Sequence, residues 1–347
     1  MKYSRVHIAA ITYELAPVVV TSEELEDRLE SVYQKLNISP GQLEYLTGIS
    51  ERRWWQKKTP LADGAISAAQ KALDSTGIDG QDIQALIYTG VCRENFEPAT
   101  ACRIGNAIGV HPAAAVYDIS NACLGVLNGI LDLANRIELG QIKAGLVVSC
   151  ESAREINELT LRELSDDPSV ERFTEALATF TGGSGAVAVL LTDGSTGNEK
   201  QHRLLGGGTQ VDLQHHELCK WGLRSDGANR FREYMKTDSV SVLKYGVQLG
   251  IRTWDSMLKE LDWTDSTVDR VICHQVGSEH QSSMLKSLNI SPKKDFVTYS
   301  YLGNMGSVSL PITAAIAEDR GVLSSGDHVC FLGIGSGLNC LMLGLEW

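Results

Sequence analysis

Two stretches of this chain show the same order of predicted helices and strands, and this internal repeat limits the possible folds more than any other feature. The first copy places its elements at 62–76, 85–90, 99–108, 115–119, 123–139, 145–149 and 186–191. The second copy places them at 246–261, 268–274, 281–288, 296–299, 306–319, 328–332 and 340–345. Because helices alternate with short apolar strands, each copy predicts a mostly parallel, buried sheet. The sequence therefore predicts an α/β fold made of two duplicated halves, 1–193 and 194–347.

Two segments fall outside the repeat. Residues 151–179 are rich in charge and have a helical pattern, which predicts an insertion or lid on the first half. Residues 194–229 are expected to form the crossover between the halves.

Composition narrows the class of protein. The 347 residues are 43% hydrophobic and 21% charged, as is ordinary for a soluble globular protein. The formal net charge of −12 argues against a nucleic-acid partner. The N-terminus lacks the apolar core of a signal peptide, and no stretch is apolar and long enough to span a bilayer. The eight cysteines are scattered without short paired spacings, which is typical of a reduced, cytoplasmic protein.

Cys123 stands where a buried strand is expected to run directly into a buried helix. A thiol at a helix N-terminus lies at the positive end of the helix dipole, near unpaired N–H groups. Both favour the thiolate, which is the nucleophilic form of cysteine. The neighbouring Ala122 and Gly125 would leave room for a substrate. The alternative is an inert core cysteine, because free cysteine is among the most buried residue types.

Aligning the two halves places three polar residues at the ends of equivalent loops. Cys123 begins the third helix of the first half, and Asn304 begins its counterpart in the second. His274 ends the first strand of the second half. Ligands bind at strand C-termini and helix N-termini in parallel α/β sheets. A pseudo-two-fold axis would bring the three side chains together, which favours a catalytic role for the set over three unrelated polar residues.

These residues belong to motifs that resemble the ketoacyl-ACP synthase III branch of the thiolase superfamily; the motifs lie at 47–53, 121–123, 274–275, 303–304 and 333–337. The resemblance implies a five-layered αβαβα thiolase-like fold and a homodimer. It implies that Cys123 takes up an acyl group as a thioester, while His274 and Asn304 hold the carbonyl of the second thioester. The oxyanion hole would be the backbone N–H groups of Cys123 and Gly335.

Further stretches are similar to the OleA subgroup, which joins two long acyl-CoA chains head to head into a β-keto acid; they lie at 53–55, 93–100, 272–276 and 332–340. The function this implies is an acyltransferase that condenses two acyl thioesters, with acyl-CoA or acyl-ACP as substrates and no cofactor. One alternative is a decarboxylating 3-oxoacyl-ACP synthase III that uses malonyl-ACP. Another is a thiolase-fold subunit without activity that supports a partner; the intact Cys123, His274 and Asn304 argue against it.

Glu97 separates the first two alternatives chemically. A malonyl substrate forms its carbanion by losing CO₂, whereas a plain acyl thioester needs a base to remove its α-proton. Glu97 resembles the glutamate that enters the active site of the partner subunit in the OleA subgroup. Its other interpretation is structural, because Glu97-Pro98 also fits a helix start with proline at the first position.

Three further residues, Arg52, Arg53 and Trp54, are candidates to bind coenzyme A through charge and stacking, and a solvated basic face is the alternative. The glycines at 333–337 precede a strand rather than a helix, so they do not predict a dinucleotide site. No histidine or cysteine spacing indicates a metal site.

Overall fold

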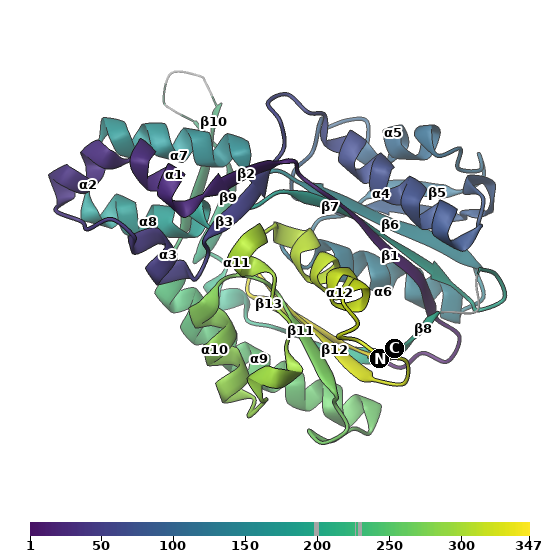
Figure 1. The fold of residues 1–347 in the computed structure, drawn as a ribbon. Helices are drawn as coiled ribbons and strands as arrows, with labels where there is room; N and C mark the ends of the chain where they lie inside the picture. The colour runs from purple at the N-terminus through teal and green to yellow at the C-terminus, as the bar shows by residue number, and fades with distance from the viewer. Residues whose placement is uncertain (198–200, 226, 228–230) are drawn as a thin grey trace.

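A computed structural model describes residues 1–197, 201–225, 227 and 231–347. Within these residues, nine strands hydrogen-bond in the order β5-β4-β6-β7-β1-β8-β13-β12-β11 (Figure 1). The strands are β1 (His7–Leu15), β4 (Ala85–Tyr88), β5 (Ala115–Asp118), β6 (Ala144–Glu151), β7 (Gly185–Thr192), β8 (His202–Val211), β11 (Arg270–Cys273), β12 (His328–Gly335) and β13 (Asn339–Glu346).

The strand pairing repeats within the sheet, as the internal repeat predicts, but the expectation of a mostly parallel sheet is wrong. Five of the eight pairings between the described strands of this sheet are antiparallel and three are parallel. β4 and β6 are parallel, and β7 lies antiparallel between β6 and β1. In the second half β11 and β12 are parallel, and β13 lies antiparallel between β12 and β8. The two sets of strands are joined in one sheet by a short pairing of β1 with β8, through His7 with Arg203 and Ile8 with His202.

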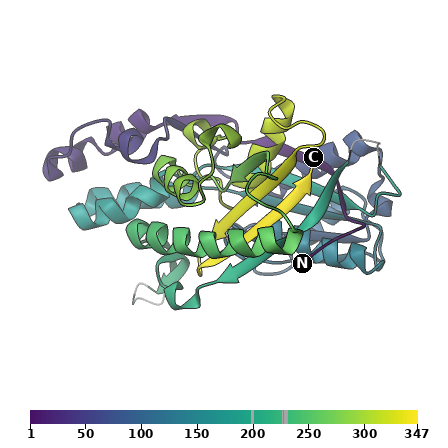
Figure 2. The same ribbon diagram turned by 90° about the horizontal axis from the view of Figure 1, so that it is seen from below.

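Helices cover both faces of each set of strands, which gives the five layers expected for the fold. Between the two sets lie α6 (Gly125–Glu138) and α12 (Ser309–Asp319), whose apolar side chains share one core cluster. The outer face of the first set carries α4 (Leu61–Thr76) and α5 (Thr100–Ala107). The outer face of the second carries α9 (Ser239–Leu261) and α10 (Ser278–Ser287). Figure 2 shows α9 lying across the strands β13 and β8.

Strand residues alternate between these cores. In β12, Phe331 faces the central cluster, while its neighbours Cys330 and Leu332 face the outer one. In β6, Val147 faces the central cluster, while Leu146 and Val148 face α4 and α5. Strands buried on both faces have continuous apolar sequences, which is why short apolar runs were enough to predict where they lie.

A further group of elements packs at one end of the molecule around its own apolar cluster (Figure 1). It contains β2 (Val18–Thr21), α1 (Ser22–Arg28), α2 (Glu30–Leu36), α3 (Gln42–Thr47), β3 (Glu51–Trp54), α7 (Arg154–Asp166) and α8 (Val170–Phe180). The helices α7 and α8 are the segment expected as an insertion or lid. The hairpin of β9 (Cys219–Ser225) and β10 (Phe231–Thr237) lies against them.

Two local predictions are wrong. The expected crossover at 194–229 contains β8, a strand of the central sheet, and β9; residues 198–200, 226 and 228–229 of it lie outside the described chain. The expected strand at 296–299 does not form, and α11 (Tyr299–Leu302) begins there instead. The side chain of Gln275 accepts hydrogen bonds from the backbone N–H groups of Thr298 (2.8 Å) and Tyr299 (3.1 Å). These donors are therefore satisfied without a neighbouring strand.

Candidate active site

Cys123 lies in a tight turn between β5 and α6. Ala122 adopts a left-handed backbone conformation with φ of 47°, which is uncommon for a residue with a side chain. The N–H of Leu124 donates to the carbonyl of Asn121 (2.9 Å), and the helix begins at Gly125. The helix thus starts two residues later than predicted, and Cys123 precedes its N-cap, Leu124. Backbone strain of this kind is found at functional sites.

Two glycines allow the turn to approach its neighbours closely. A Cβ atom at Gly125 would lie 2.2 Å from the carbonyl oxygen of Thr89, so only glycine fits there. A Cβ atom at Gly335, at the end of β12, would lie 3.5 Å from the backbone nitrogen of Cys123. The structure therefore brings together Cys123 and Gly335, the two residues proposed for the oxyanion hole.

The half-buried Cys123 opens onto a cavity of about 460 Å³, a size that suits a small-molecule site. Cys123, Glu151, Asn304 and Ser336 line its inner end. Its other walls come from α7, α8 and the β9–β10 hairpin, including Ile156, Ala178, Thr179, Trp221 and Met235. The predicted lid is thus part of the wall of the site.

Asn304 is held in this cavity by its backbone and by its side-chain oxygen. Its N–H donates to the carbonyl of Thr181 (2.8 Å), and its carbonyl accepts from the N–H of Gly183 (2.9 Å). The side-chain oxygen accepts from the N–H of Gly306 (3.1 Å) and more weakly from the hydroxyl of Ser309 (3.5 Å). The side-chain NH₂ group has no hydrogen-bond acceptor among the described residues, so it is free to donate to a ligand.

His274 follows β11 directly, and its N–H donates to the carbonyl of Leu332 in β12 (3.0 Å). It is buried, and its Nδ1 atom has no hydrogen-bond partner in the described part of the chain. Burial lowers the pKa of His274 to about 3, with a smaller contribution from His280. The imidazole is therefore neutral at physiological pH and carries one N–H. His274 lines a small space of about 10 Å³ with Gly333 and Ile334, beside the strand end that reaches Cys123.

The thiol of Cys123 is not activated in the way that the sequence suggested. Its pKa is raised to about 12, mainly by burial and to a smaller extent by the nearby Cys219 and Glu151. The expectation of a pKa lowered by the helix N-terminus is wrong, because removal of the thiolate from water outweighs the dipole. A thiol in this state has to give up its proton in the same step in which its sulfur attacks a substrate.

This difference can be measured by alkylation. Below the pKa of the thiol, the thiolate fraction rises about tenfold for each pH unit, and thiolate is the reacting form. We expect iodoacetamide labelling of Cys123, measured by peptide mapping, to accelerate steadily from about pH 7 to about pH 10. Cys123→Ala identifies the peptide concerned. A rate that levels off near neutral pH would show instead that the helix N-terminus dominates.

Glu97 lies outside the cavity of its own chain. It is exposed, in a loop at 91–98 where Phe96 is 94% exposed. The structural interpretation of Glu97 is wrong, because α5 begins at Thr100 and its N-cap is Ala99. Asp118 supplies the acid at this helix start, accepting from the N–H groups of Thr100 (2.9 Å) and Ala101 (3.0 Å).

Two of the three residues predicted to bind coenzyme A are buried in the structure. Arg52 is fully buried and donates to the carbonyl of Val20 (3.4 Å) and the hydroxyl of Ser22 (3.0 Å). Trp54 is also buried, and its indole N–H donates to the carbonyl of Gly182 (3.2 Å). Arg53 alternates with them and is half-buried. This placement argues against direct substrate contact by Arg52 and Trp54, and against a solvated position for either of them.

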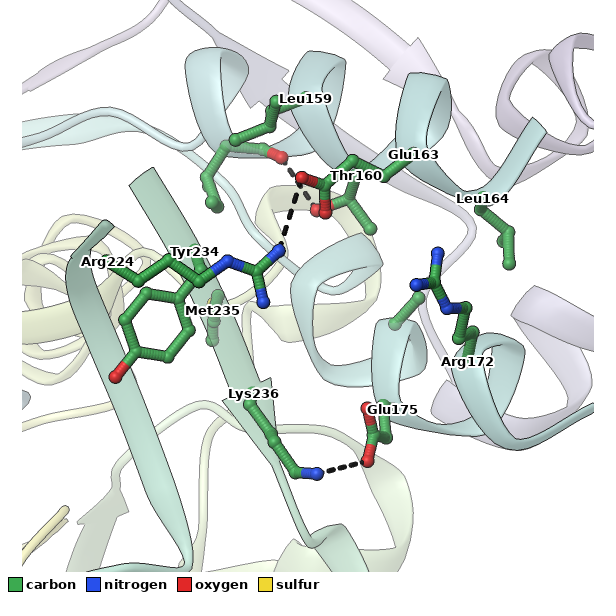
Figure 3. Close-up of a pocket in the computed structure, with 12 residues that line it drawn as sticks. Leu159, Thr160, Glu163, Leu164, Arg172, Glu175, Arg224, Tyr234, Met235 and Lys236 are labelled. Carbon is green, nitrogen blue, oxygen red and sulfur yellow. Dashed lines mark hydrogen bonds and ion pairs between the residues drawn. The ribbon is translucent and has the colours of Figure 1, made fainter. Parts of the chain in front are cut away.

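A second pocket of about 190 Å³ lies between α7, α8 and the hairpin, and it shares Ile156, Tyr234 and Met235 with the first (Figure 3). Ion pairs cross it, from Arg224 to Glu163 (3.4 Å) and from Lys236 to Glu175 (2.7 Å) (Figure 3).

Glu151 is a cavity residue that the sequence analysis missed; it ends the buried strand β6, and His274 similarly follows the end of β11. The rule that placed His274 at a ligand site applies equally to it.

Over 1–197, 201–225, 227 and 231–347, no group of three or more histidine, cysteine or acidic side chains is arranged to hold a metal ion. In the same residues, no helix combines the length and the apolar character needed to cross a bilayer.

Comparison with known proteins identifies relatives along the whole chain. A model of the 3-oxoacyl-[acyl-carrier-protein (ACP)] synthase III C-terminal region matches residues 258–347. An acyl-CoA:acyl-CoA alkyltransferase of Shewanella oneidensis is 60% identical, with 100% of both chains covered. A β-ketoacyl-[acyl-carrier-protein] synthase III of Bacillus cereus is 30% identical, with 95% of this chain and 94% of that protein covered.

Solved structures of a relative have the same fold as this chain. Xanthomonas campestris OleA, in a crystal structure of a glutamate variant, matches with a TM-score of 0.92 at 33% identity, covering 100% of this chain and 98% of that one. A cysteine variant of the same enzyme, with bound lauric acid and lauroyl-CoA, matches with a TM-score of 0.91 at 32% identity, covering 99% of this chain and 100% of that one. The thiolase-like fold is thereby confirmed. The chain belongs to the acyl-CoA:acyl-CoA alkyltransferase (OleA) family, among the 3-oxoacyl-ACP synthase III-like condensing enzymes of the thiolase superfamily.

Proposed function

We propose that this protein joins two acyl-CoA molecules head to head, without decarboxylation, through an acyl group carried on Cys123. The observation that carries the proposal is the single cavity shared by the Cys123 thiol and the free amide of Asn304. Support also comes from the Shewanella relative, whose name states an acyl-CoA:acyl-CoA transfer, and from lauroyl-CoA bound to the Xanthomonas enzyme.

In the first step the sulfur of Cys123 attacks the thioester carbon of one acyl-CoA. A new C–S bond forms, the bond to coenzyme A breaks, and the thiol proton ends on the departing coenzyme A. The negative oxygen formed during attack is stabilised by the backbone N–H groups of Cys123 and Gly335. Such donors are already in place before reaction, so they cost no reorganisation when the charge appears.

In the second step a second acyl-CoA loses its α-proton to Glu97 and becomes an enolate. His274, which is neutral and has one N–H, and the NH₂ group of Asn304 donate to the enolate oxygen. The α-carbon attacks the acyl group on Cys123, and the sulfur of Cys123 leaves. The proton held by Glu97 then passes to that sulfur. The product is a β-ketoacyl-CoA, and water releases the β-keto acid from it.

The position of Glu97 makes this a reaction of two subunits. Glu97 is exposed and does not line the cavity of its own chain, so the base for each site would come from a second copy in a homodimer. The proposed carriers are acyl-CoA and, as the alternative, acyl-ACP, and the proposed location is the cytoplasm. We also propose that the chain divides between residues 193 and 194 into its two duplicated halves.

The function is tested by mass spectrometry of the products. With long-chain acyl-CoA as the only substrate, we expect a β-keto acid, or the ketone formed from it by loss of CO₂, that contains both acyl chains. Addition of malonyl-ACP should produce no new condensation product. Product that appears only with malonyl-ACP would assign the chain to the decarboxylating synthases, which the Bacillus relative represents. No product in either case would favour the inactive-subunit alternative.

A further inference from the structure

Glu151 is a buried carboxylate in the wall of the Cys123 cavity, and the steps above do not use it. Its side chain ends β6 and is 3% exposed. One oxygen accepts from the N–H of Val91 (3.0 Å), and from the hydroxyl (2.5 Å) and N–H (3.4 Å) of Ser307. The other accepts from the N–H of Cys92 (3.1 Å).

These contacts show that Glu151 does not act as the base. A carboxylate whose oxygens already accept four hydrogen bonds has little capacity left for a substrate proton. Its charge also opposes the chemistry, since it raises the pKa of the Cys123 thiol and would repel an enolate. Burial raises the pKa of Glu151, and the hydrogen bonds to Val91, Cys92 and Ser307 oppose that shift, so the geometry points to a carboxylate that holds these groups in place.

The groups that Glu151 holds belong to two loops of the site. Val91 and Cys92 begin the loop at 91–98 that carries Glu97. Ser307 follows Asn304 by three residues. A Cβ atom at Gly306 would lie 3.4 Å from the carboxyl carbon of Glu151, so the Asn304 loop packs directly on this side chain.

The loop at 91–98 is fixed at both ends by carboxylates. Glu151 binds the backbone N–H groups of Val91 and Cys92 at its start, and Asp118 binds those of Thr100 and Ala101 just after its end. Between these points Phe96, Glu97 and Pro98 are exposed. Fixed ends limit how far an exposed tip can move, which matters for a base that must reach a site in another subunit.

We propose that Glu151 is a positioning residue that holds the Glu97 loop of its own chain in the shape required by the partner's active site. The proposal rests on the proposed function, in which Glu97 acts across the dimer. Its distinctive consequence is that a side chain in the wall of one cavity serves the reaction in the other cavity.

Glu151→Gln is a suitable substitution because it keeps the shape of the side chain. The amide NH₂ can donate to the Ser307 hydroxyl, and the amide oxygen can accept from one backbone N–H. With its NH₂ group facing the Ser307 hydroxyl, the amide leaves the N–H groups of Val91 and Ser307 without this acceptor, while the N–H of Cys92 keeps one. The variant therefore loosens the Glu97 loop at Val91, and on the side of the Asn304 loop it loses only the long 3.4 Å bond from the Ser307 N–H. Displacement of a catalytic group by about 1 Å can reduce a rate about 100-fold.

The experiment uses mixed dimers with one complete site. A donor chain with Cys123→Ala supplies Glu97, and an acceptor chain with Glu97→Gln supplies Cys123; two affinity tags isolate the mixed dimer. Glu151→Gln is placed on the donor in one preparation and on the acceptor in another. Glu155→Gln on the donor is the matched control, because Glu155 is an exposed glutamate whose side chain accepts a hydrogen bond from the Ser152 hydroxyl (2.6 Å).

We expect Glu151→Gln on the donor to slow condensation by about tenfold to 100-fold. Acylation of Cys123 in the same dimer should stay unchanged, which shows that the dimer is intact. The same change on the acceptor should have a much smaller effect, and Glu155→Gln none. Equal losses on the two chains, or a loss on the acceptor alone, would overturn the positioning role. A mixed dimer that is inactive before any change at Glu151 contradicts instead the reach of Glu97 across the dimer, and with it the basis of the inference.

Discussion

Cys123→Ala is expected to abolish formation of the acyl-enzyme and, with it, all condensation. Both steps of the proposed reaction pass through the thioester on this sulfur, so no other group can replace it. The measurement is incubation with a long-chain acyl-CoA, followed by intact mass and peptide mapping. The parent protein should carry one acyl group on Cys123, and the variant none.

The chain offers its own controls for this result. Cys102 is exposed on α5, and Cys102→Ala should acylate and condense as the parent does. Cys219 lines the same cavity as Cys123, so the mapping must resolve the two peptides. An acyl group on Cys92, Cys102 or Cys219, together with a fully active Cys123→Ala, would contradict the mechanism at its first step.

The succession of strands along each repeat could be predicted from the sequence because most of these strands are buried on both faces and apolar. The strands β1 and β8 could not, because they lie outside the repeat and carry partly exposed residues. The internal repeat then related Cys123 to Asn304 and placed His274 at a strand end, before any contact was known. The strand expected at 296–299 does not form, and the pattern of apolar residues does not show why. There a single side chain, that of Gln275, satisfies the backbone donors that would otherwise pair with a strand.

Properties that depend on burial were harder to predict. A helix N-terminus is worth about 1 kcal/mol to a nearby anion. Burial can shift a pKa by about three to five units, so it decides the state of the Cys123 thiol. The sequence shows that Cys123 is near a helix start, but not how much water reaches it. The turn is also set by packing, because the glycines at 125 and 335 let Thr89 and β12 approach.

The exposure of the basic motif at 52–54 also could not be predicted from its charge. In β3, residues 52 and 54 face one way and residue 53 the other, which is the ordinary alternation of a strand. Charge suggested that Arg52 faces solvent, whereas its guanidinium donates to Val20 and Ser22 inside the molecule, where burial lowers its pKa to about 10. Composition indicates which groups are present, and only the packing shows which of them a substrate can reach.

The structure contradicts the interpretation of Glu97 as a residue that begins a helix. Asp118 already accepts from the first N–H groups of α5, and Glu97 is left exposed on a loop whose ends are fixed. A loop held in this way presents a carboxylate outward, which suits a role in another subunit. The α-proton of a thioester is weakly acidic, and His274 and Asn304 are needed as donors to the enolate oxygen.

Glu97→Gln is therefore expected to acylate Cys123 at the parent rate and to lose condensation of two acyl-CoA molecules by roughly 10²–10⁴-fold, the usual contribution of a general base. The substitution keeps the shape of the side chain and removes only its basicity. Glu97→Asp, which keeps a carboxylate on a shorter side chain, should retain more activity than Glu97→Gln. Acylation is followed by intact mass, and condensation by the β-keto acid formed from acyl-CoA alone. Production of β-keto acid by Glu97→Gln at the parent rate would exclude Glu97 as the base. In that case the enolate would need another base, and Glu151 could not serve without giving up the hydrogen bonds that hold Val91, Cys92 and Ser307.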